Sequence, residues 1–109
     1  MSTLVTDLQP TLDYDMMRKN ADQACRMIKT LANRDRLLLL CQLSQGEKRV
    51  GELEAMTHIQ QPTLSQQLAV LREEGVVSTR REGKHIHYSI SSPIAMSVME
   101  LLYATYCGK

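Results

Sequence analysis

The stretch from Gln60 to Gly75 reads Gln-Gln-Pro-Thr-Leu-Ser-Gln-Gln-Leu-Ala-Val-Leu-Arg-Glu-Glu-Gly, and the fold can be worked out from it. Leu64, Leu68 and Leu71 recur at positions i, i+4 and i+7, which is the spacing of one face of an α-helix. The proline near the start is tolerated only in the first turn of a helix, and the final glycine suits a left-handed helix end. The spacing therefore predicts an amphipathic helix with both ends marked.

Ahead of Arg72, the polar residues of this predicted helix are amides and hydroxyls, and no acid occurs before Glu73. A glutamine side chain carries a donor and an acceptor, so it can pair with the N6 and N7 edge of adenine, and serine or threonine can address several base edges. The pattern favours a helix that reads DNA, although an ordinary amphipathic surface helix would have the same pattern. The residues expected to face DNA from this helix are Gln61, Thr63, Ser65, Gln66 and Gln67.

Three further helices are expected ahead of this one. Apolar side chains recur at helical spacing over residues 13 to 31, with Asp13 as the cap. Asn33 is expected to cap a second helix, from Arg34 to about Gln45, whose run of four leucines must lie in the core. After a polar turn at residues 46 to 49, a short third helix over residues 50 to 56 ends in a turn at residues 57 to 59. Two helices joined by such a short turn, the second with a polar face, form the helix-turn-helix pattern.

Beyond residue 75 the period changes from that of a helix to that of a strand. Residues 77, 79 and 81 alternate with their neighbours, as do residues 86, 88 and 90, across a turn at residues 82 to 84. This predicts a β-hairpin, or wing, whose tip gathers Arg80, Arg81, Lys84 and His85 against the single acid Glu82. Such a wing suits contact with DNA phosphates, although a solvated hairpin tip is the alternative.

The last helix predicts how the chain assembles. Ser92 followed by Pro93 is a cap with proline in the first helical position, so a helix is expected from there to Tyr106 or Cys107. Its apolar side chains cover more than one face, and Glu100 is its only charge. A domain of this size cannot bury all of that surface by itself. We therefore expect a two-fold dimer sealed by this helix, with help from the first helix.

Composition sets the limits of this interpretation. A chain of 109 residues is one domain by size, with residues 1–12 as a flexible N-terminal arm and residues 13–109 as the DNA-binding and dimerisation domain. The net charge of +1 is too small to indicate nucleic-acid binding by itself, so the prediction of DNA binding depends on local clusters of charge. The sequence has no run long and apolar enough to span a membrane and no leader pattern, so we expect a cytoplasmic protein without membrane partners.

Taken together, these segments resemble the ArsR/SmtB family of winged-helix repressors over nearly the whole chain after residue 13. The matching motifs are Leu31 to Leu37, Val50 to Leu53, Gln61 to Leu68, Leu71 to Val77, and Arg80 to Lys84 before Tyr88. The resemblance implies a mainly α fold with a small β-hairpin, a dimeric winged helix-turn-helix in the order α-α-α-α-β-β-α. It also implies a homodimer on double-stranded operator DNA. Arg72 lies in one matched motif and joins Arg80, Lys84 and His85 of the hairpin in the expected DNA-binding set.

Three cysteines, Cys25, Cys41 and Cys107, lack the spacing of a structural disulfide framework. Cys25 lies on the apolar stripe of the first helix, where core packing is favoured. Cys41 and Cys107 resemble the dithiol of the subgroup of BigR and SqrR, which responds to reactive sulfur species. The resemblance implies that bridging Cys41 and Cys107 by persulfide or oxidant releases the operator, and that sulfide-detoxification genes are controlled. Cys107, near the chain end, is expected to be exposed and reactive.

Other functions stay open at this point. A metal-responsive repressor of the same family would carry cysteines in the third helix or acid and histidine ligands in the last, and a zinc site at Cys41 and Cys107 would lack a fourth ligand. A thiol redox enzyme would need a CxxC pair or a base held beside a nucleophile. A winged helix used only for protein contact is a third alternative. We expect no catalytic activity, no metal and no cofactor.

Overall fold

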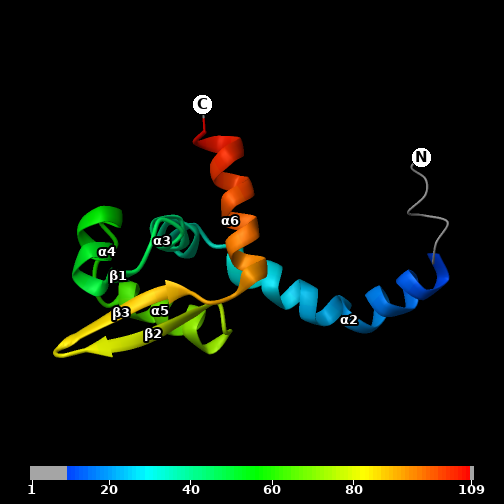
Figure 1. Ribbon diagram of the computed structural model, residues 1–109, viewed down its shortest axis with the longest axis horizontal. Coiled ribbons are helices and arrows are strands. Elements are labelled where there is room, and N and C mark those ends of the chain that lie inside the picture. Colours follow the sequence, from blue (N-terminus) through cyan, green and yellow to red (C-terminus); the bar gives the residue numbers. More distant parts are fainter. Residues whose placement is uncertain (1–9, 109) are drawn as a thin grey trace.

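The computed structural model describes residues 10 to 108, with side chains described from residue 13 onward. Within that part of the chain, five helices and three short strands follow one another (Figure 1). The helices are α2 (Pro10–Leu31), α3 (Arg34–Leu43), α4 (Val50–Thr57), α5 (Thr63–Glu73) and α6 (Pro93–Tyr106). The strands are β1 (Lys48–Arg49), β2 (Val77–Glu82) and β3 (His85–Ile90). This order agrees with the sequence prediction apart from the additional strand β1.

The start of α2 differs from the expectation. The helix begins at Pro10 rather than at Asp13, so residues 10 to 12 belong to a helix and not to the predicted arm. A proline is accepted there because the first turn of a helix has no use for its missing N–H group. The rest of the predicted arm, residues 1 to 9, lies outside the described residues.

The expected polar turn before α4 contains the strand β1. Lys48 lies opposite Tyr88 and Arg49 opposite His87, so β1 pairs antiparallel with β3 and the sheet has the order β1-β3-β2. A strand of two residues has no alternation that a sequence could display, which is why the pattern did not predict it. The pairing fixes the middle of β3 against the segment that leads into α4.

Helix α3 lies at the centre of the core. Leu39 and Leu40 are fully buried, Leu43 is nearly so, and the helix contacts α2, α4, α5, α6 and β3. The other buried apolar residues surround it; they are Leu31, Leu53, Ile59, Leu64, Leu68, Leu71, Val76, Val77, Ala95 and Met99. The prediction that the leucine run of this helix lies in the core is therefore confirmed.

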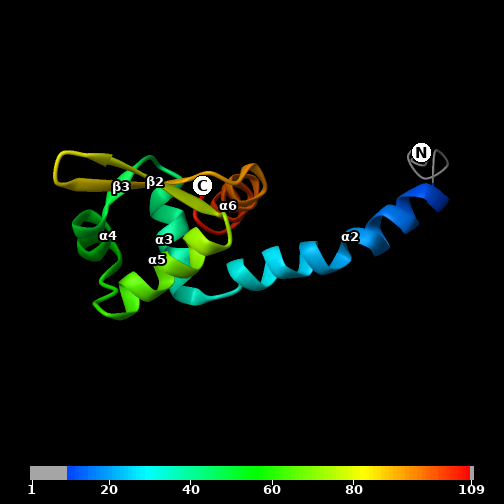
Figure 2. The same cartoon turned by 90° about the horizontal axis from the view of Figure 1, so that it is seen from below.

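Helices α4 and α5 form a helix-turn-helix, and the hairpin forms a wing beside it. His58, with a φ of 62°, ends α4 in the left-handed conformation. Strands β2 and β3 turn at Gly83, whose φ is also 62°, and the hairpin tip lies at the edge of the molecule, slightly beyond α4 (Figures 1 and 2). The fold is thus a mainly α winged helix-turn-helix, as predicted.

Helix α2 projects away from the rest of the molecule. Only its C-terminal part lies beside α3 and α6, and its N-terminal half extends outward in both views (Figures 1 and 2). The principal extents of 53 × 33 × 24 Å reflect this projection. Much of the apolar stripe on α2 is therefore exposed in the single chain.

The side chain that caps α3 can be tested for its contribution to stability. The Asn33 side chain accepts a hydrogen bond from the Arg36 backbone N–H at 3.0 Å. Asn33→Ala should lower the free energy of unfolding by about 1 kcal/mol because that N–H loses its acceptor, whereas Asn33→Asp keeps the acceptor. Urea denaturation at one fixed protein concentration measures both. A loss for Asn33→Asp as large as that for Asn33→Ala would contradict the capping role.

Candidate DNA-binding surface and thiol pair

The outer face of α5 carries most of the residues that were expected to face DNA. Ser65 and Gln66 are exposed, and Thr63 is half-buried in the first turn. Gln61 is exposed just ahead of the helix, where its Oε1 accepts hydrogen bonds from the Ser65 backbone N–H (3.2 Å) and from Ser65 Oγ (2.7 Å). This contact satisfies one of the donors left open at the start of a helix, and it uses only the oxygen of the Gln61 amide, whose N–H₂ group can donate elsewhere.

Gln67 does not share that outer face. Its side chain is half-buried, and its Oε1 accepts a hydrogen bond from Arg36 Nη1 at 2.7 Å. The expectation that Gln67 lies with the other polar residues is therefore wrong. Gln67 is three residues after Leu64 and four before Leu71, so it belongs to the stripe that α5 turns toward α3.

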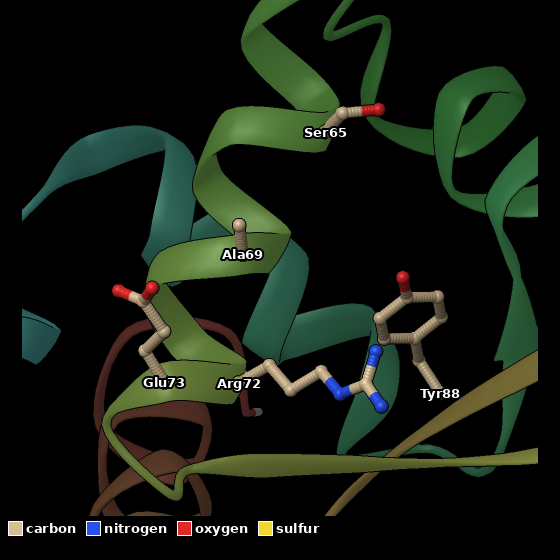
Figure 3. Close-up of a pocket in the computed structure, with 5 residues that line it drawn as sticks. All are labelled: Ser65, Ala69, Arg72, Glu73 and Tyr88. Atoms are coloured by element: carbon tan, nitrogen blue, oxygen red, sulfur yellow. The ribbon is translucent and has the colours of Figure 1, made fainter.

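A cleft of about 410 Å³ separates α5 from the hairpin (Figure 3). Ser65, Ala69 and Arg72 of α5 line one side of it, and Tyr88 of β3 lines the other. Arg72 extends from the helix toward the Tyr88 ring (Figure 3). The exposed guanidinium of Arg72 thus lies between the recognition helix and the wing, where a DNA strand that touches both would pass.

The wing holds one of its predicted cations in an ion pair. Arg80 donates from Nε and Nη2 to the two carboxylate oxygens of Glu47 at 2.7 and 2.8 Å, and Glu82 lies 3.5 Å from its Nη1. The pairing lowers the pKa of the Glu47 carboxyl and raises the pKa of Arg80. Arg80 is therefore paired with Glu47 in the free protein, and its assignment to phosphate contact stays a prediction.

Arg81, which the sequence placed at the wing tip but outside the expected DNA-binding set, is a further cation of the wing. It pairs across the hairpin with Ile86, two residues before Tyr88, so the alternation of the strands puts it on the face of the wing that includes Tyr88. Arg81 is exposed, and no ion pair joins it to another described residue. Lys84 and His85 are also exposed at the tip, as expected, and His85 Nδ1 lies 3.5 Å from Arg49 Nη1.

Cys41 and Cys107 lie on two different helices, and the charge of one affects the titration of the other. Cys41 is half-buried on α3 against the core, and Cys107 is exposed at the C-terminal end of α6. Burial raises the pKa of the Cys41 thiol, and the charge of the neighbouring Cys107 raises it further. Cys25 is exposed on the projecting helix α2, so the expectation that it packs in the core of the chain is wrong.

Two kinds of arrangement are not found in the described part of the chain. Among its histidine, cysteine, aspartate and glutamate side chains, no group of three or more is placed to hold a metal ion. None of its helices has both the length and the hydropathy that crossing a membrane requires.

Comparison with known proteins agrees with this architecture. Residues 33–79 match the family described as "Bacterial regulatory protein, arsR family". The Biofilm growth-associated repressor of Agrobacterium fabrum is 54% identical over 84% of this chain and 79% of its own length. The crystal structure of the transcriptional repressor BigR from Xylella fastidiosa has a TM-score of 0.79 at 45% identity, covering 88% of this chain and 98% of that one.

A third relative, HlyU of Vibrio cholerae, is named a transcriptional activator. Its reduced form matches with a TM-score of 0.80 at 41% identity, over 84% of this chain and 97% of that chain. The fold and the exposed polar helix define a winged helix-turn-helix DNA-binding regulator. The chain belongs to the arsR family of bacterial regulatory proteins.

The orientation of the side chains predicts two kinds of DNA contact. Gln66→Ala removes an exposed amide from α5 and should cost about 1–3 kcal/mol of binding to the preferred sequence and much less to random DNA. Lys84→Ala removes a charge at the wing tip, so it should weaken both alike and reduce the salt slope by about 1. Fluorescence anisotropy on specific and random duplexes at several salt concentrations measures this. Equal losses on both duplexes for Gln66→Ala would rule out base reading by that residue.

Proposed function

We propose that the protein is a dimeric transcriptional repressor that binds a two-fold operator while its thiols are reduced and leaves it when Cys41 and Cys107 are bridged by reactive sulfur. The regulated genes would then be those for sulfide detoxification, and the protein would act in the cytoplasm, where bacterial operators are. The switch is supported by two free thiols on different helices, one half-buried and one exposed, that influence each other electrostatically.

The proposed DNA contacts follow from what each exposed side chain can offer. Gln66, Ser65 and the free amide donors of Gln61 provide hydrogen bonds on a helix of the size that enters the major groove. Lys84 and Arg81 provide charge at the wing for phosphates, which position the protein without reading sequence. Arg72, between the two, joins the backbone contacts.

The apolar surface shared by α2 and α6 supports the proposed dimer. A groove of about 710 Å³ runs between the two helices, lined by Ala24, Met27, Ile28 and Leu31 of α2 and by Ile94, Val98 and Leu102 of α6, among others. Ile28 and Ile94 are 63% and 62% exposed in the single chain. Exposed apolar side chains gathered over two helices favour burial against a second copy of the same surface.

The dimer surface can be tested with a matched pair of substitutions. Ile94→Glu adds a charge to the groove and should convert a micromolar dimer to monomer, because the new carboxylate would be buried at the interface. Met56→Glu is the control, since Met56 is 50% exposed on α4, away from the groove. Analytical ultracentrifugation measures both. A parent protein that sediments as a monomer and still binds its operator tightly would refute the dimer.

The proposed bridging reaction uses persulfide as its oxidant. Exposed Cys107, as thiolate, attacks the outer sulfur of a persulfide RSSH, displaces RS⁻ and becomes a persulfide itself. A second transfer adds another sulfur. The Cys41 thiolate then attacks the middle sulfur of Cys107–S–S–SH, displaces HS⁻ and closes a trisulfide. Each step exchanges one S–S bond for another, so electrons balance, and the raised pKa of Cys41 suits it to react second.

An inserted sulfur also relaxes the geometric demand on the bridge. A direct disulfide needs Cα atoms within about 7 Å, and each further sulfur adds up to roughly 2 Å of reach. A bridge between α3 and α6 then changes how α6 lies against α3. Because α6 carries part of the proposed dimer surface, the change would alter the spacing of the two recognition helices.

The switch predicts different responses from the three cysteine variants. Cys41→Ser and Cys107→Ser should each bind operator like the parent and stay bound after treatment with a sulfane-sulfur donor. Cys25→Ser is the control and should release DNA at the parent's dose. Gel shift gives the release, and mass spectrometry should find a Cys41–Cys107 link with extra sulfur in the parent, formed more readily by the donor than by peroxide. Release by either of the first two variants at the parent's dose would refute the dithiol switch.

A further inference from the structure

The guanidinium of Arg36 on α3 makes hydrogen bonds to two other helices, α2 and α5. Its Nε donates to the Thr30 carbonyl oxygen at 2.6 Å, and its Nη2 lies 3.4 Å from the Lys29 carbonyl oxygen. Its Nη1 donates to Gln67 Oε1 at 2.7 Å. Lys29 and Thr30 belong to the last turn of α2, and Gln67 lies in the middle of α5. One side chain on α3 thus contacts the end of one helix and the centre of another.

These contacts have a clear physical basis. The last carbonyl groups of a helix have no partner within it, and a positive group is favoured at that end by the helix dipole. Arg36 supplies both the donors and the charge for α2. Its guanidinium has donors in a rigid planar fork, so satisfying α2 fixes the direction in which Nη1 points, and Gln67 meets it there.

A second polar contact ties the same two helices together. Arg26 of α2 donates from Nε and Nη2 to the carboxylate of Glu74, at the C-terminal end of α5, at 2.7 and 3.1 Å. Between the two contacts lies an open cleft of about 310 Å³, lined by residues of α2 and by Glu73 and Glu74. Polar contacts at two points, with a cleft between them, therefore set how α5 lies relative to α2.

We propose that Arg36 and Gln67 form a positioning pair that sets the orientation of the recognition helix relative to α2, and that Gln67 contributes to operator affinity without reading a base. The consequence for the spacing of two recognition helices rests on the proposed function, in which α2 carries part of the dimer surface. The consequence for binding to a single half-site does not rest on the proposed dimer. It requires only that the orientation of α5 determines where Gln66 and Ser65 present their hydrogen-bonding groups.

The competing role for Gln67 is base reading, and one substitution separates the two. A glutamine that reads adenine needs both its acceptor and its amide donor. Positioning needs only the acceptor that Arg36 contacts. Gln67→Glu keeps an acceptor for the guanidinium, with its charge balanced by Arg36, and removes the donor. Gln67→Met has a similar size and removes both.

The experiment selects preferred sites from random duplexes with the full-length parent, Gln67→Glu, Gln67→Met, Arg36→Met and the Gln67→Met/Arg36→Met double variant. Affinity for the parent's selected site and for random DNA is then measured for each. We expect Gln67→Met and Arg36→Met to lose about tenfold in specific affinity, as for a lost hydrogen bond to a charged group, with random-DNA affinity and base preferences retained. Gln67→Glu should stay within about threefold of the parent. The double variant should be no worse than the more damaging single one, because both remove the same contact.

Three results would overturn the proposal. These are a changed base preference in Gln67→Glu, a loss in Gln67→Glu equal to that in Gln67→Met, and no loss in Gln67→Met. An unfolded variant would lose binding to random DNA as well, and a thermal unfolding measurement on Gln67→Met identifies that case. The affinity and base preference of Gln67→Glu would then decide between positioning and base reading. Failure of the proposed function would give a different result, because the parent protein itself would select single half-sites or would not respond to a sulfur donor. The affinities of the variants for one half-site could still be compared in that case.

Discussion

The packing of α3 among five neighbouring elements is the constraint on which the rest of the structure depends. Leu39, Leu40 and Leu43 fill the centre of the core, and α2, α4, α5, α6 and β3 are arranged around them. A close-packed interior moves as discrete units and does not deform smoothly. A change in how α6 or α2 lies against α3 must therefore shift whole helices. Because α5 also packs against α3, it would shift with them.

The groups with functional roles extend from this same helix. Arg36, near its start, contacts the end of α2 and Gln67 of α5. Cys41, in its last turns, is influenced by the charge of Cys107 at the end of α6. In the proposed function, the Cys41–Cys107 bridge at one end of α3 changes the position of α6. At the other end, the hydrogen bonds of Arg36 couple the position of α2 to that of the recognition helix α5. The coupling needs no long chain of residues, because one rigid helix carries both contacts.

Most of the fold could be predicted because its signals are local. The cap and proline at residues 92 and 93, the period of the hairpin and the leucines of α5 each mark their element within a few residues. The features that local signals miss are contacts between distant segments. Arg80 forms an ion pair with Glu47, which lies in a loop 33 positions earlier, and no local pattern in the sequence indicates that partner. Gln67 could have been placed correctly, since with Leu64, Leu68 and Leu71 it completes the i, i+3, i+4, i+7 stripe; its polar side chain suggested the wrong face.

The most direct test of the central claim is the distance between the two recognition helices before and after bridging. A spin label attached through a non-cysteine chemistry at residue 73, which is exposed at the end of α5 and outside the proposed DNA contacts, allows pulsed electron paramagnetic resonance on the dimer. The account predicts one narrow distance distribution in the reduced, operator-bound protein, consistent with half-sites about 34 Å apart or a multiple of that. It predicts a shifted distribution after treatment with a sulfane-sulfur donor, and no shift when Cys41 is replaced by serine. An identical distribution before and after bridging in the parent protein would contradict it.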